Sequence, residues 1–306
     1  MVDKGHKFGG LWTKQKLECL RKYLSAYTKI MSRNQSARFF ETYYVDAFAG
    51  TGDALIKSEE PTGLQFFGQD VDALRTEVEE YIAGSARLAL ETEPPFDRFL
   101  FIEKKDAHCE RLDSLKDEYP ELASRVEVVS ADANEYLLSW CGEFPRFNRR
   151  AVVFLDPYGM QVEWELVRNI AVTEAIDLWL LFPVSAVLRT LPHSGELPPS
   201  WRSCLTRLFG TEGWESEFYR PEEEGDLLSV LPDFDAPKRL ATFEKIGEYF
   251  LRRLRNAFRF VADRPLTLCN SRGSPLYLFC FAANNPKAAT AKRIAEDIMG
   301  KMANGA

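Results

Sequence analysis

The sequence predicts an α/β fold built on a mostly parallel, doubly wound sheet. Five runs rich in aromatic and β-branched residues alternate with amphipathic segments, which is the rhythm of β-α-β units. An acidic residue lies near or just beyond the end of four of these runs. Because the carboxyl ends of parallel strands meet at one edge of a sheet, where ligands bind, we expect these acidic residues to form one site. The predicted strands are 43–49, 98–102, 126–130, 150–155 and 175–182.

The composition is typical of a folded, soluble protein, with 45% hydrophobic and 28% charged residues in a chain of 306. No apolar run approaches the roughly 20 residues that span a bilayer, and the first residues contain no apolar signal region. We therefore expect a cytoplasmic protein without a membrane segment. The six cysteines form no C-x-x-C pair and the three histidines lie far apart. This pattern favours reduced core cysteines over disulfides or a metal site.

Charge is distributed unevenly along the chain. The net charge is −7, yet residues 236–306 contain 13 Lys and Arg against 5 Asp and Glu. This basic C-terminal quarter has two interpretations. It is a surface that faces phosphates, or it is a set of solvated helix faces.

The first predicted element is a helix from about Thr13 to Met31, because apolar residues recur there at spacings of three and four. Thr13 is the expected N-cap. A glycine-rich, aromatic segment, 8–12, precedes the helix. Two interpretations are open for Trp12 and Lys16. They anchor the helix, or they contact a ligand bound at the strand ends.

The first strand runs into the string Val45-Asp46-Ala47-Phe48-Ala49-Gly50-Thr51-Gly52. It is not the dinucleotide-binding fingerprint, which would need glycine where Leu55 stands. The pattern acidic-x-Phe-x-Gly-x-Gly resembles the first motif of class I S-adenosylmethionine-dependent methyltransferases. That resemblance implies that Gly50 and Gly52 pass under the methionine part of the cofactor, with Asp46 at the strand end and Phe48 between. The alternative is a purely structural turn.

A long insert, roughly 53–97, separates the first two strands, with predicted helices at Asp70–Ile82 and from residue 84 onward. Glu103 ends the second strand, where a carboxylate suits the two ribose hydroxyls of a nucleoside because it accepts both hydrogen bonds. Asp132 follows the third strand and is the candidate acceptor for an adenine amine. Glu103 could instead be a surface residue. Asp132 could be the N-cap of the next helix, and that role is compatible with adenine binding.

The fourth strand is almost entirely apolar and ends in Asp156-Pro157-Tyr158-Gly159. This string resembles the catalytic Asp/Asn-Pro-Pro-Tyr/Phe loop of methyltransferases that act on amino nitrogens. There the Asp156 carboxylate and the Pro157 carbonyl would accept the two N–H hydrogens of a weakly nucleophilic amine and orient its lone pair. Tyr158 would stack on a planar base. The second proline of that motif is absent here, and a plain strand-end turn is the alternative.

The α/β rhythm stops after the fifth strand, at Pro183. Helices are expected at 184–191, 201–209 and 241–258, so residues 184–259 form a predicted helical insert for substrate selection. Residues 1–183 and 260–306 form the methyltransferase-like domain. A hairpin closes a seven-stranded, mostly parallel sheet with antiparallel strands. Its strands lie at 259–268 and 276–281, and a helix at 286–302 follows with Pro286 in its first turn.

Several further strings occur together over nearly the whole chain. They are Trp12-Thr13 with Lys16-Leu17, Tyr23 to Tyr27, Val45 to Gly52, Phe101-Ile102-Glu103, Phe154 to Gly159, Leu181-Phe182-Pro183, and Phe209-Gly210-Thr211 with Trp214. Together they resemble the three-Cys-motif partner (TcmP) family. The resemblance implies a Rossmann-like class I methyltransferase fold that binds S-adenosylmethionine. It also implies a partner that carries the three cysteines, an iron–sulfur protein.

These observations lead to a first hypothesis and two alternatives. The first is an S-adenosylmethionine-dependent methyltransferase, with an amino nitrogen of a base in RNA or DNA as the candidate acceptor. The second is a non-catalytic, cofactor-binding scaffold, which the missing proline favours. The third is a small-molecule methyltransferase, which the acidic net charge favours. The methyl acceptor is left open by the sequence.

Overall fold

The central sheet confirms the predicted fold class. A computed structural model describes residues 11–48, 84–219 and 239–304. Within them the strand order is β3-β2-β1-β4-β5-β8-β6, and β7 also pairs with β8. The first five strands are parallel, and β8 is antiparallel to β5. The strands are β1 Glu41–Ala47, β2 Arg98–Glu103, β3 Val126–Ser130, β4 Arg149–Leu155, β5 Ile176–Phe182, β6 Phe260–Val261, β7 Leu266–Cys269 and β8 Pro275–Ala283.

Two short strands share the last position of this sheet. Phe260 of β6 pairs with Ala283, and Leu266 of β7 pairs with Phe279, so β6 and β7 lie end to end along β8. Pro265, which has no N–H to donate, stands between them. The described strands therefore occupy the seven predicted positions, with the last position split in two.

The order of the strands fixes where a ligand can bind. The chain builds β1, β2 and β3 outward in one direction and then returns to place β4 and β5 on the other side of β1. The winding therefore reverses between β1 and β4, and in open α/β sheets the crevice at the carboxyl ends of such strands binds ligands. Asp46 in β1 and Asp156, just after β4, are placed at this position.

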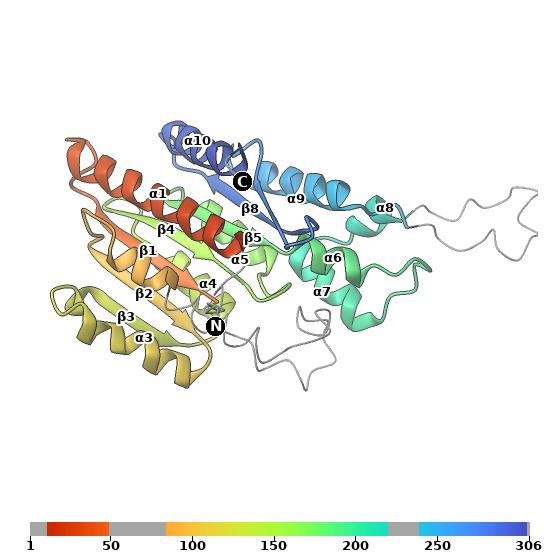
Figure 1. The fold of residues 1–306 in the computed structure, drawn as a ribbon, viewed down its shortest axis with the longest axis horizontal. Helices are drawn as coiled ribbons and strands as arrows, with labels where there is room; N and C mark the ends of the chain where they lie inside the picture. Colours follow the sequence, from red (N-terminus) through yellow and green to blue (C-terminus); the bar gives the residue numbers. More distant parts are fainter. Residues whose placement is uncertain (1–10, 49–83, 220–238, 305–306) are drawn as a thin grey trace, which may run out of the picture.

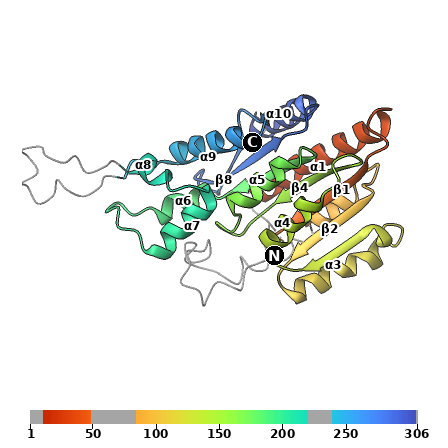
Figure 2. The same cartoon turned by 180° about the vertical axis from the view of Figure 1, so that it is seen from behind.

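Helices cover both faces of the sheet (Figures 1 and 2). The apolar residues of α1, α3, α10 and the helical residues 84–90 form one core cluster, whereas those of α4 and α5 belong to the other. Adjacent residues of a strand face opposite sides, so Tyr44 joins the first cluster and Val45 the second. The helices are α1 Leu11–Arg33, α3 Asp106–Glu118, α4 Ala133–Glu143, α5 Trp164–Val172, α6 Val184–Thr190, α7 Pro199–Phe209, α8 Trp214–Phe218, α9 Phe243–Ala257 and α10 Ala289–Asn304.

Helices α6 to α9 lie at the right-hand end of the molecule in Figure 1, and the described parts of 184–259 are largely helical. Their apolar side chains continue the core of the α4–α5 face, and the rings of Phe182 and Phe250 stack 3.8 Å apart. Gly210 ends α7 with φ of 65°, and a Cβ there would collide with the indole of Trp164. The insert thus shares its core with the sheet. Among the described helices, none is both long and apolar enough to cross a membrane.

Several predicted details are wrong or lie outside the described residues. Helix α1 begins at Leu11, so Thr13 is inside the helix and is not its N-cap. Helix α10 begins at Ala289, because the Asn285 side chain accepts a hydrogen bond from the N–H of Lys287 and forms a turn around Pro286. The short helix α8 was not expected. The predicted helix Asp70–Ile82 lies outside the described residues. All six cysteines are free thiols, and four are buried.

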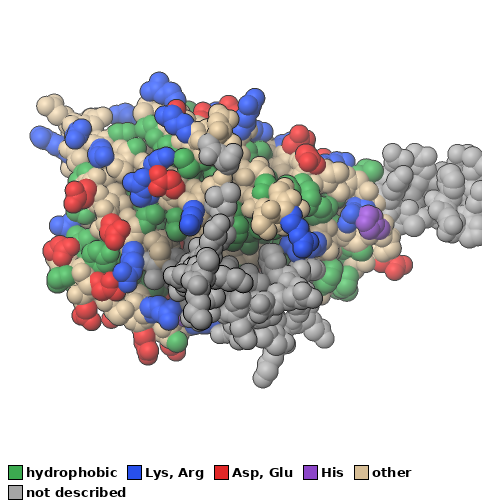
Figure 3. All heavy atoms as spheres, in the orientation of Figure 1, with side chains coloured by type: hydrophobic (Ala, Val, Ile, Leu, Met, Phe, Trp, Pro, Cys, Tyr) green, Lys and Arg blue, Asp and Glu red, His purple; other side chains and the backbone are tan. Residues whose placement is uncertain are grey.

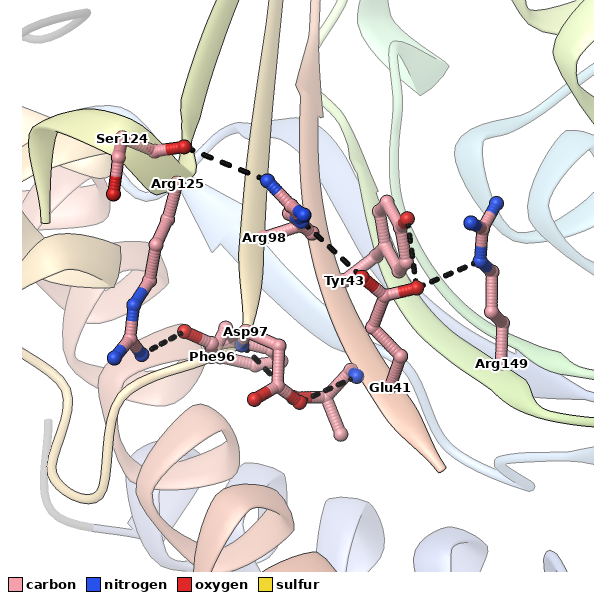
Figure 4. A network of polar contacts seen from close by, with 9 residues as sticks. Glu41, Tyr43, Phe96, Asp97, Arg98, Ser124, Arg125 and Arg149 are labelled. Carbon is pink, nitrogen blue, oxygen red and sulfur yellow. Dashed lines mark hydrogen bonds and ion pairs between the residues drawn. The ribbon is translucent and has the colours of Figure 1, made fainter. Parts of the chain in front are cut away.

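A polar network fastens the amino ends of the central strands, at the edge opposite the predicted site (Figure 4). Glu41 of β1 accepts hydrogen bonds from Arg98 of β2 at 3.1 Å and from Arg149 of β4 at 2.8 Å. The hydroxyl of Tyr43 donates to the same carboxylate. Burial alone would raise the pKa of Glu41, but these donors and the charge of Arg149 lower it. One carboxylate thus ties three neighbouring strands together.

We expect Glu41→Gln to lower the free energy of unfolding by about 1 kcal/mol at pH 7, because exposed ion pairs each contribute less than about 1 kcal/mol. Since the pKa of Glu41 is lowered in the folded protein, this contribution is present above the ordinary glutamate pKa of about 4.3 and is lost at lower pH. Urea unfolding at pH 7 and pH 3.5 measures it, with the exposed Glu121→Gln as control. An equal loss at both pH values would contradict the assignment.

Candidate functional site

A buried ion pair lies where α1 meets the carboxyl end of β4. Lys16 is 1% exposed, and its Nζ lies 2.7 Å from Oδ2 of Asp156. The ammonium also lies 5.1 Å from the ring centroid of Trp12 and 5.9 Å from that of Phe154. Burial lowers the pKa of Lys16, and the charge of Asp156 opposes this effect. The structure therefore brings together three predicted site residues, Trp12, Lys16 and Asp156.

Asp46 is a second carboxylate beside this pair. It is 2% exposed and accepts a hydrogen bond of 3.2 Å from the hydroxyl of Tyr44. The pKa of Asp46 is raised to about 7, mainly by burial and also by the charge of Asp156, although a hydrogen bond with Ser85 and the charge of Lys16 oppose the increase. One ammonium group thus faces two carboxylates in a space with little water, and the charge state of Asp46 changes near neutral pH.

The chain leaves β1 in an uncommon backbone conformation. Phe48 has φ of 67°, in the left-handed region that non-glycine residues seldom adopt, and its side chain is 6% exposed. Strain of this kind persists where surrounding packing holds it, and it concentrates at ligand-binding turns. The predicted cofactor turn begins here. Gly50 and Gly52, its two glycines, lie outside the described residues.

Glu103 ends β2 as a buried carboxylate with one unused oxygen. It is 1% exposed, and its Oε1 accepts a hydrogen bond of 2.9 Å from the N–H of Lys105. Its Oε2 is buried and accepts no hydrogen bond from a described residue. Burial raises the pKa of Glu103 to about 7, and nearby backbone N–H groups moderate the increase. A buried acceptor without a donor costs free energy, which hydroxyl groups of a ligand would recover.

Asp132 lies beside Glu103, since the N–H of Ala131 donates to the backbone oxygen of Glu103 at 3.0 Å. Its Oδ1 caps α4 by accepting from the N–H groups of Asn134 at 3.0 Å and Glu135 at 3.4 Å. Its Oδ2 lies 3.3 Å from Nζ of Lys104. The N-cap interpretation is therefore confirmed. It leaves Oδ2 facing an exposed lysine, so the carboxylate keeps capacity for a ligand.

The loop after β4 is held in one shape. The N–H of Tyr158 donates to Oε1 of Gln161 at 3.2 Å, and Gly159 has φ of 74°, which only glycine adopts without strain. Pro157 is buried. The hydroxyl of Tyr158 is buried and has no hydrogen-bond partner among the described residues. Burial raises the pKa of this tyrosine well above its ordinary value.

Two further residues of the site were not predicted from the sequence. Tyr277 of β8 packs against Trp12, with ring centroids 5.2 Å apart. Burial raises the pKa of its hydroxyl, and the charge of Asp156 adds to the effect. Arg189 of α6 is close enough for its charge to act on Tyr158 and Tyr277. Arg189 is the only charged residue in 184–191, a signal that could have identified it, whereas Tyr277 follows ordinary strand alternation.

Comparisons with known proteins add little to this geometry. No protein-family model matches the chain, and no curated protein matches it. Among solved structures, the chain is similar to spermidine synthase from Thermotoga maritima, with a TM-score of 0.38 and 10% identity. It is also similar to a spermidine synthase in complex with the transition state analogue AdoDATO, with a TM-score of 0.37 and 10% identity. Each match covers 92% of this chain and 62% of the other. Likeness at this level carries no argument about function.

The chain spans less than two thirds of the length of these spermidine synthase structures. The predicted site residues keep their proposed roles as predictions. Asp46, Glu103, Asp132 and Asp156 lie at or beside the carboxyl ends of β1 to β4, whereas Trp12 and Lys16 lie on α1.

We expect Asp46→Asn to stabilise the protein at pH 8 but not at pH 4. The pKa of Asp46 is raised to about 7 in the folded protein, whereas the unfolded value is about 3.9. Its contribution to stability is thus fully present below about pH 4 and is lost as pH rises through 7. Removing the carboxylate should raise the free energy of unfolding at pH 8 by roughly 2 kcal/mol, less than the full shift because Lys16 loses an attractive neighbour.

Chemical denaturation of the unmodified protein and of Asp46→Asn at pH 4 and pH 8 measures this change in the free energy of unfolding. The exposed Asp117→Asn variant is the matched control, and its effect should not depend on pH. If Asp46→Asn destabilised the protein equally at both pH values, the carboxylate would be fully ionised in the folded state and the assignment would be wrong.

Proposed function

We propose that the protein is an S-adenosylmethionine-dependent methyltransferase whose acceptor is an amino nitrogen. The observation that carries the proposal is the buried Oε2 of Glu103, which accepts no hydrogen bond from a described residue. It lies at the end of β2, beside the reversal in strand order between β1 and β4. A nucleoside bound across these strand ends would donate its ribose hydroxyls to this acceptor.

The neighbouring residues suit the rest of such a cofactor. Asp132 follows β3, next to Glu103, and its Oδ2 could accept a hydrogen bond from an adenine amine. Gly50 and Gly52 are predicted to leave room for the methionine part of the cofactor. Trp12 and Lys16 would contact the cofactor from the side on which α1 lies. When bound, S-adenosylmethionine supplies a methyl group on a sulfonium centre.

The loop after β4 is suited to hold the acceptor. Lys16 contacts Oδ2 of Asp156, so Oδ1 remains to accept one N–H of an amine. The carbonyl of Pro157 would accept the second, which directs the nitrogen lone pair away from both acceptors and toward the cofactor side. Tyr158 would pack against a planar acceptor. Its buried hydroxyl has no hydrogen-bond partner among the residues that the structure describes, and it would bind a polar group of the substrate.

A scaffold without transferase activity is the second candidate, because Lys16 already occupies one oxygen of Asp156 and the second proline of the motif is absent. The arginines of α9 give little support to nucleic acid as the acceptor. Arg252 pairs with Glu217 at 2.9 Å, and Arg253 and Arg255 donate to backbone carbonyls. A small-molecule acceptor agrees with the net charge of −7. A three-cysteine, iron–sulfur partner stays a prediction from the family resemblance.

We expect S-adenosylmethionine to bind more weakly as pH falls below 7. Ribose hydroxyls stabilise the ionised form of Glu103, whose pKa is about 7 in the free protein. Binding should therefore release a proton, and the dissociation constant should rise up to about tenfold per pH unit below that pKa. Titration calorimetry in buffers of different ionisation enthalpy measures both effects.

Glu103→Gln should weaken binding about 10- to 100-fold and abolish the pH dependence, because hydrogen bonds to a charged acceptor contribute about 1.5–3 kcal/mol. Glu127→Gln, on the exposed side of β3, is the control. No binding by the well-folded protein would reject the cofactor. Unchanged binding by Glu103→Gln would reject only the assigned role of this residue.

Transfer of a labelled methyl group separates the enzyme from the scaffold. Total cellular RNA, DNA and a metabolite extract are offered with labelled S-adenosylmethionine, and we expect incorporation into one fraction. Asp156→Ala should reduce it at least about 100-fold, because positioning of the reacting nitrogen is lost. The double variant Lys16→Met, Asp156→Ala keeps the buried charges balanced and shows whether the loss comes from misfolding. Tight cofactor binding without incorporation in any fraction would favour the scaffold.

A further inference from the structure

A second recognition surface lies at the amino edge of the sheet, away from the site described above. A groove of about 770 Å³ is formed by the C-terminal half of α1, the turn 34–40 and the first residues of α10. Arg150 and Asp177, each the second residue of its strand, lie at its floor. Arg150 is six residues before Asp156, so about 20 Å of β4 separates the groove from the predicted acceptor loop.

The walls and lip of the groove are apolar and partly exposed. Ile30 is 39% exposed and Phe39 is 61% exposed, whereas large apolar side chains of a folded protein are mostly covered. The ring of Phe39 packs against that of Phe40 in a tilted arrangement, with centroids 4.0 Å apart, and the guanidinium of Arg150 lies 3.7 Å from the Phe40 ring centroid. Phe39 lines the groove and is exposed, and we refer to it as the lip of the groove. A concave apolar groove with an exposed aromatic lip is typical of a surface that receives a protruding side chain.

We define the rim of the groove as the two segments 29–40 and 285–294, which supply lining residues and whose charged residues are all basic. The segments 29–40 and 285–294 contain six Lys and Arg and no Asp or Glu, in a chain whose net charge is −7. Lys292 pairs with Asp263 at 3.0 Å, but the other five form no ion pair with a described residue. Figure 3 shows Lys and Arg gathered at the upper left, over the end of α1 and the start of α10. The five cations of the two segments that form no ion pair with a described residue are Lys29, Arg33, Arg38, Lys287 and Arg293.

The floor holds polar groups that still lack partners. Asp177 is 7% exposed, and its Oδ2 accepts a hydrogen bond of 2.6 Å from the hydroxyl of Tyr23. Its Oδ1 and the hydroxyl of Tyr27 form no hydrogen bond with a described residue. Both lie within reach of a donor that enters the groove. An aromatic side chain with a polar tip, Tyr or Trp, satisfies the apolar walls and the buried acceptor together.

We propose that this basic-rimmed groove docks an acidic amphipathic segment of another protein, with a Tyr or Trp anchor inserted toward Asp177. The acidic residues of the segment pair with the five cations of the rim, and its apolar face covers Ile30 and Phe39. Recognition of a helix or short segment in an apolar groove uses this division between anchors and flanking charges.

Other occupants fit less well. A second copy of this chain would place a basic rim against a basic rim if the same face paired with itself. A nucleic-acid backbone would leave the apolar walls uncovered and would bring phosphates toward the carboxylate of Asp177. A lipid surface is broad, so it would contact the lip at Phe39 and not the concave floor. These occupants are the alternative outcomes of the test.

Site-specific photo-crosslinking tests the proposal in the full-length protein. A benzoylphenylalanine introduced at Phe39 is irradiated in the cells that naturally produce the protein, and the crosslinked segment is sequenced by mass spectrometry. We expect one protein segment with a net negative charge, an apolar face and a Tyr or Trp near the crosslink. Crosslinks only to this chain itself, to nucleic acid or to lipid, or no crosslink, would overturn the proposal.

The identified segment is then synthesised, labelled and titrated against the purified protein by fluorescence anisotropy. Ile30→Asp, and separately Arg33→Glu with Arg38→Glu, should each weaken binding at least about tenfold, and added salt should weaken it further. Val172→Asp, at a side chain 67% exposed on α5, is the matched control. Since all these side chains are exposed, thermal melting should show folded variants. Binding that is unaffected by the charge reversals would overturn the proposal.

Discussion

The arrangement of the predicted site depends on one constraint, that a buried ammonium must be matched by buried carboxylates. Lys16 reaches the sheet from α1 and contacts Asp156, while Asp46 of the neighbouring strand lies beside them. Removing Asp156 alone would leave the Lys16 ammonium buried without its ion-pair partner, which costs about 3–5 kcal/mol. The three residues thus fix the position of α1 over the sheet. They lie where the winding of the sheet reverses, between β1 and β4.

The excess of carboxylates over ammonium groups has a chemical consequence. Two carboxylates and one ammonium lie close together here, and burial raises the pKa of Asp46 because it disfavours the charged form. The pair formed by Lys16 and Asp156 leaves Asp46 as a second buried carboxyl group, whose raised pKa of about 7 lets it gain or lose a proton near neutral pH. A sulfonium centre carries a positive charge. A site with this imbalance is suited electrostatically to such a cofactor.

Much of the fold could be predicted from the sequence, because its parallel strands are nearly continuous apolar runs followed by polar strand ends. Residues 126–130 are predicted and observed as the same strand, and the ends of β2 and β4 agree to within one residue. Helix boundaries were harder. Thr13 and Pro286 are residues that often start helices. Thr13 nevertheless lies inside α1, which already includes Leu11, and the turn at Asn285 delays the start of α10 until Ala289. Helix α8 has five residues, too few to show a period.

The site was predictable only in part, because sequence position identifies strand ends but not contacts between distant residues. Lys16 and Asp156 are 140 positions apart, and the sequence pattern around each of them does not predict that they are in contact. Tyr277 joins the site from the antiparallel strand β8, where alternation indicates only a half-buried residue. Some motif strings proved to be structural: Gly210 has no room for a side chain beside Trp164, and the indole N–H of Trp214 donates to Thr206.

Helix α1 contributes to both ends of the molecule. Its N-terminal part carries Trp12 and Lys16 to the carboxyl edge of the sheet, and its C-terminal part provides Tyr27 and Ile30 at the amino edge. A continuous helix is stiff along its axis, and the 14 residues from Lys16 to Ile30 span about 21 Å. The helix therefore couples the position of Ile30 at the amino edge to the position of Lys16 at the carboxyl edge. An axial displacement of its far end would move the Lys16 ammonium by the same distance, and hydrogen-bond geometry at Asp156 tolerates only a few tenths of an ångström.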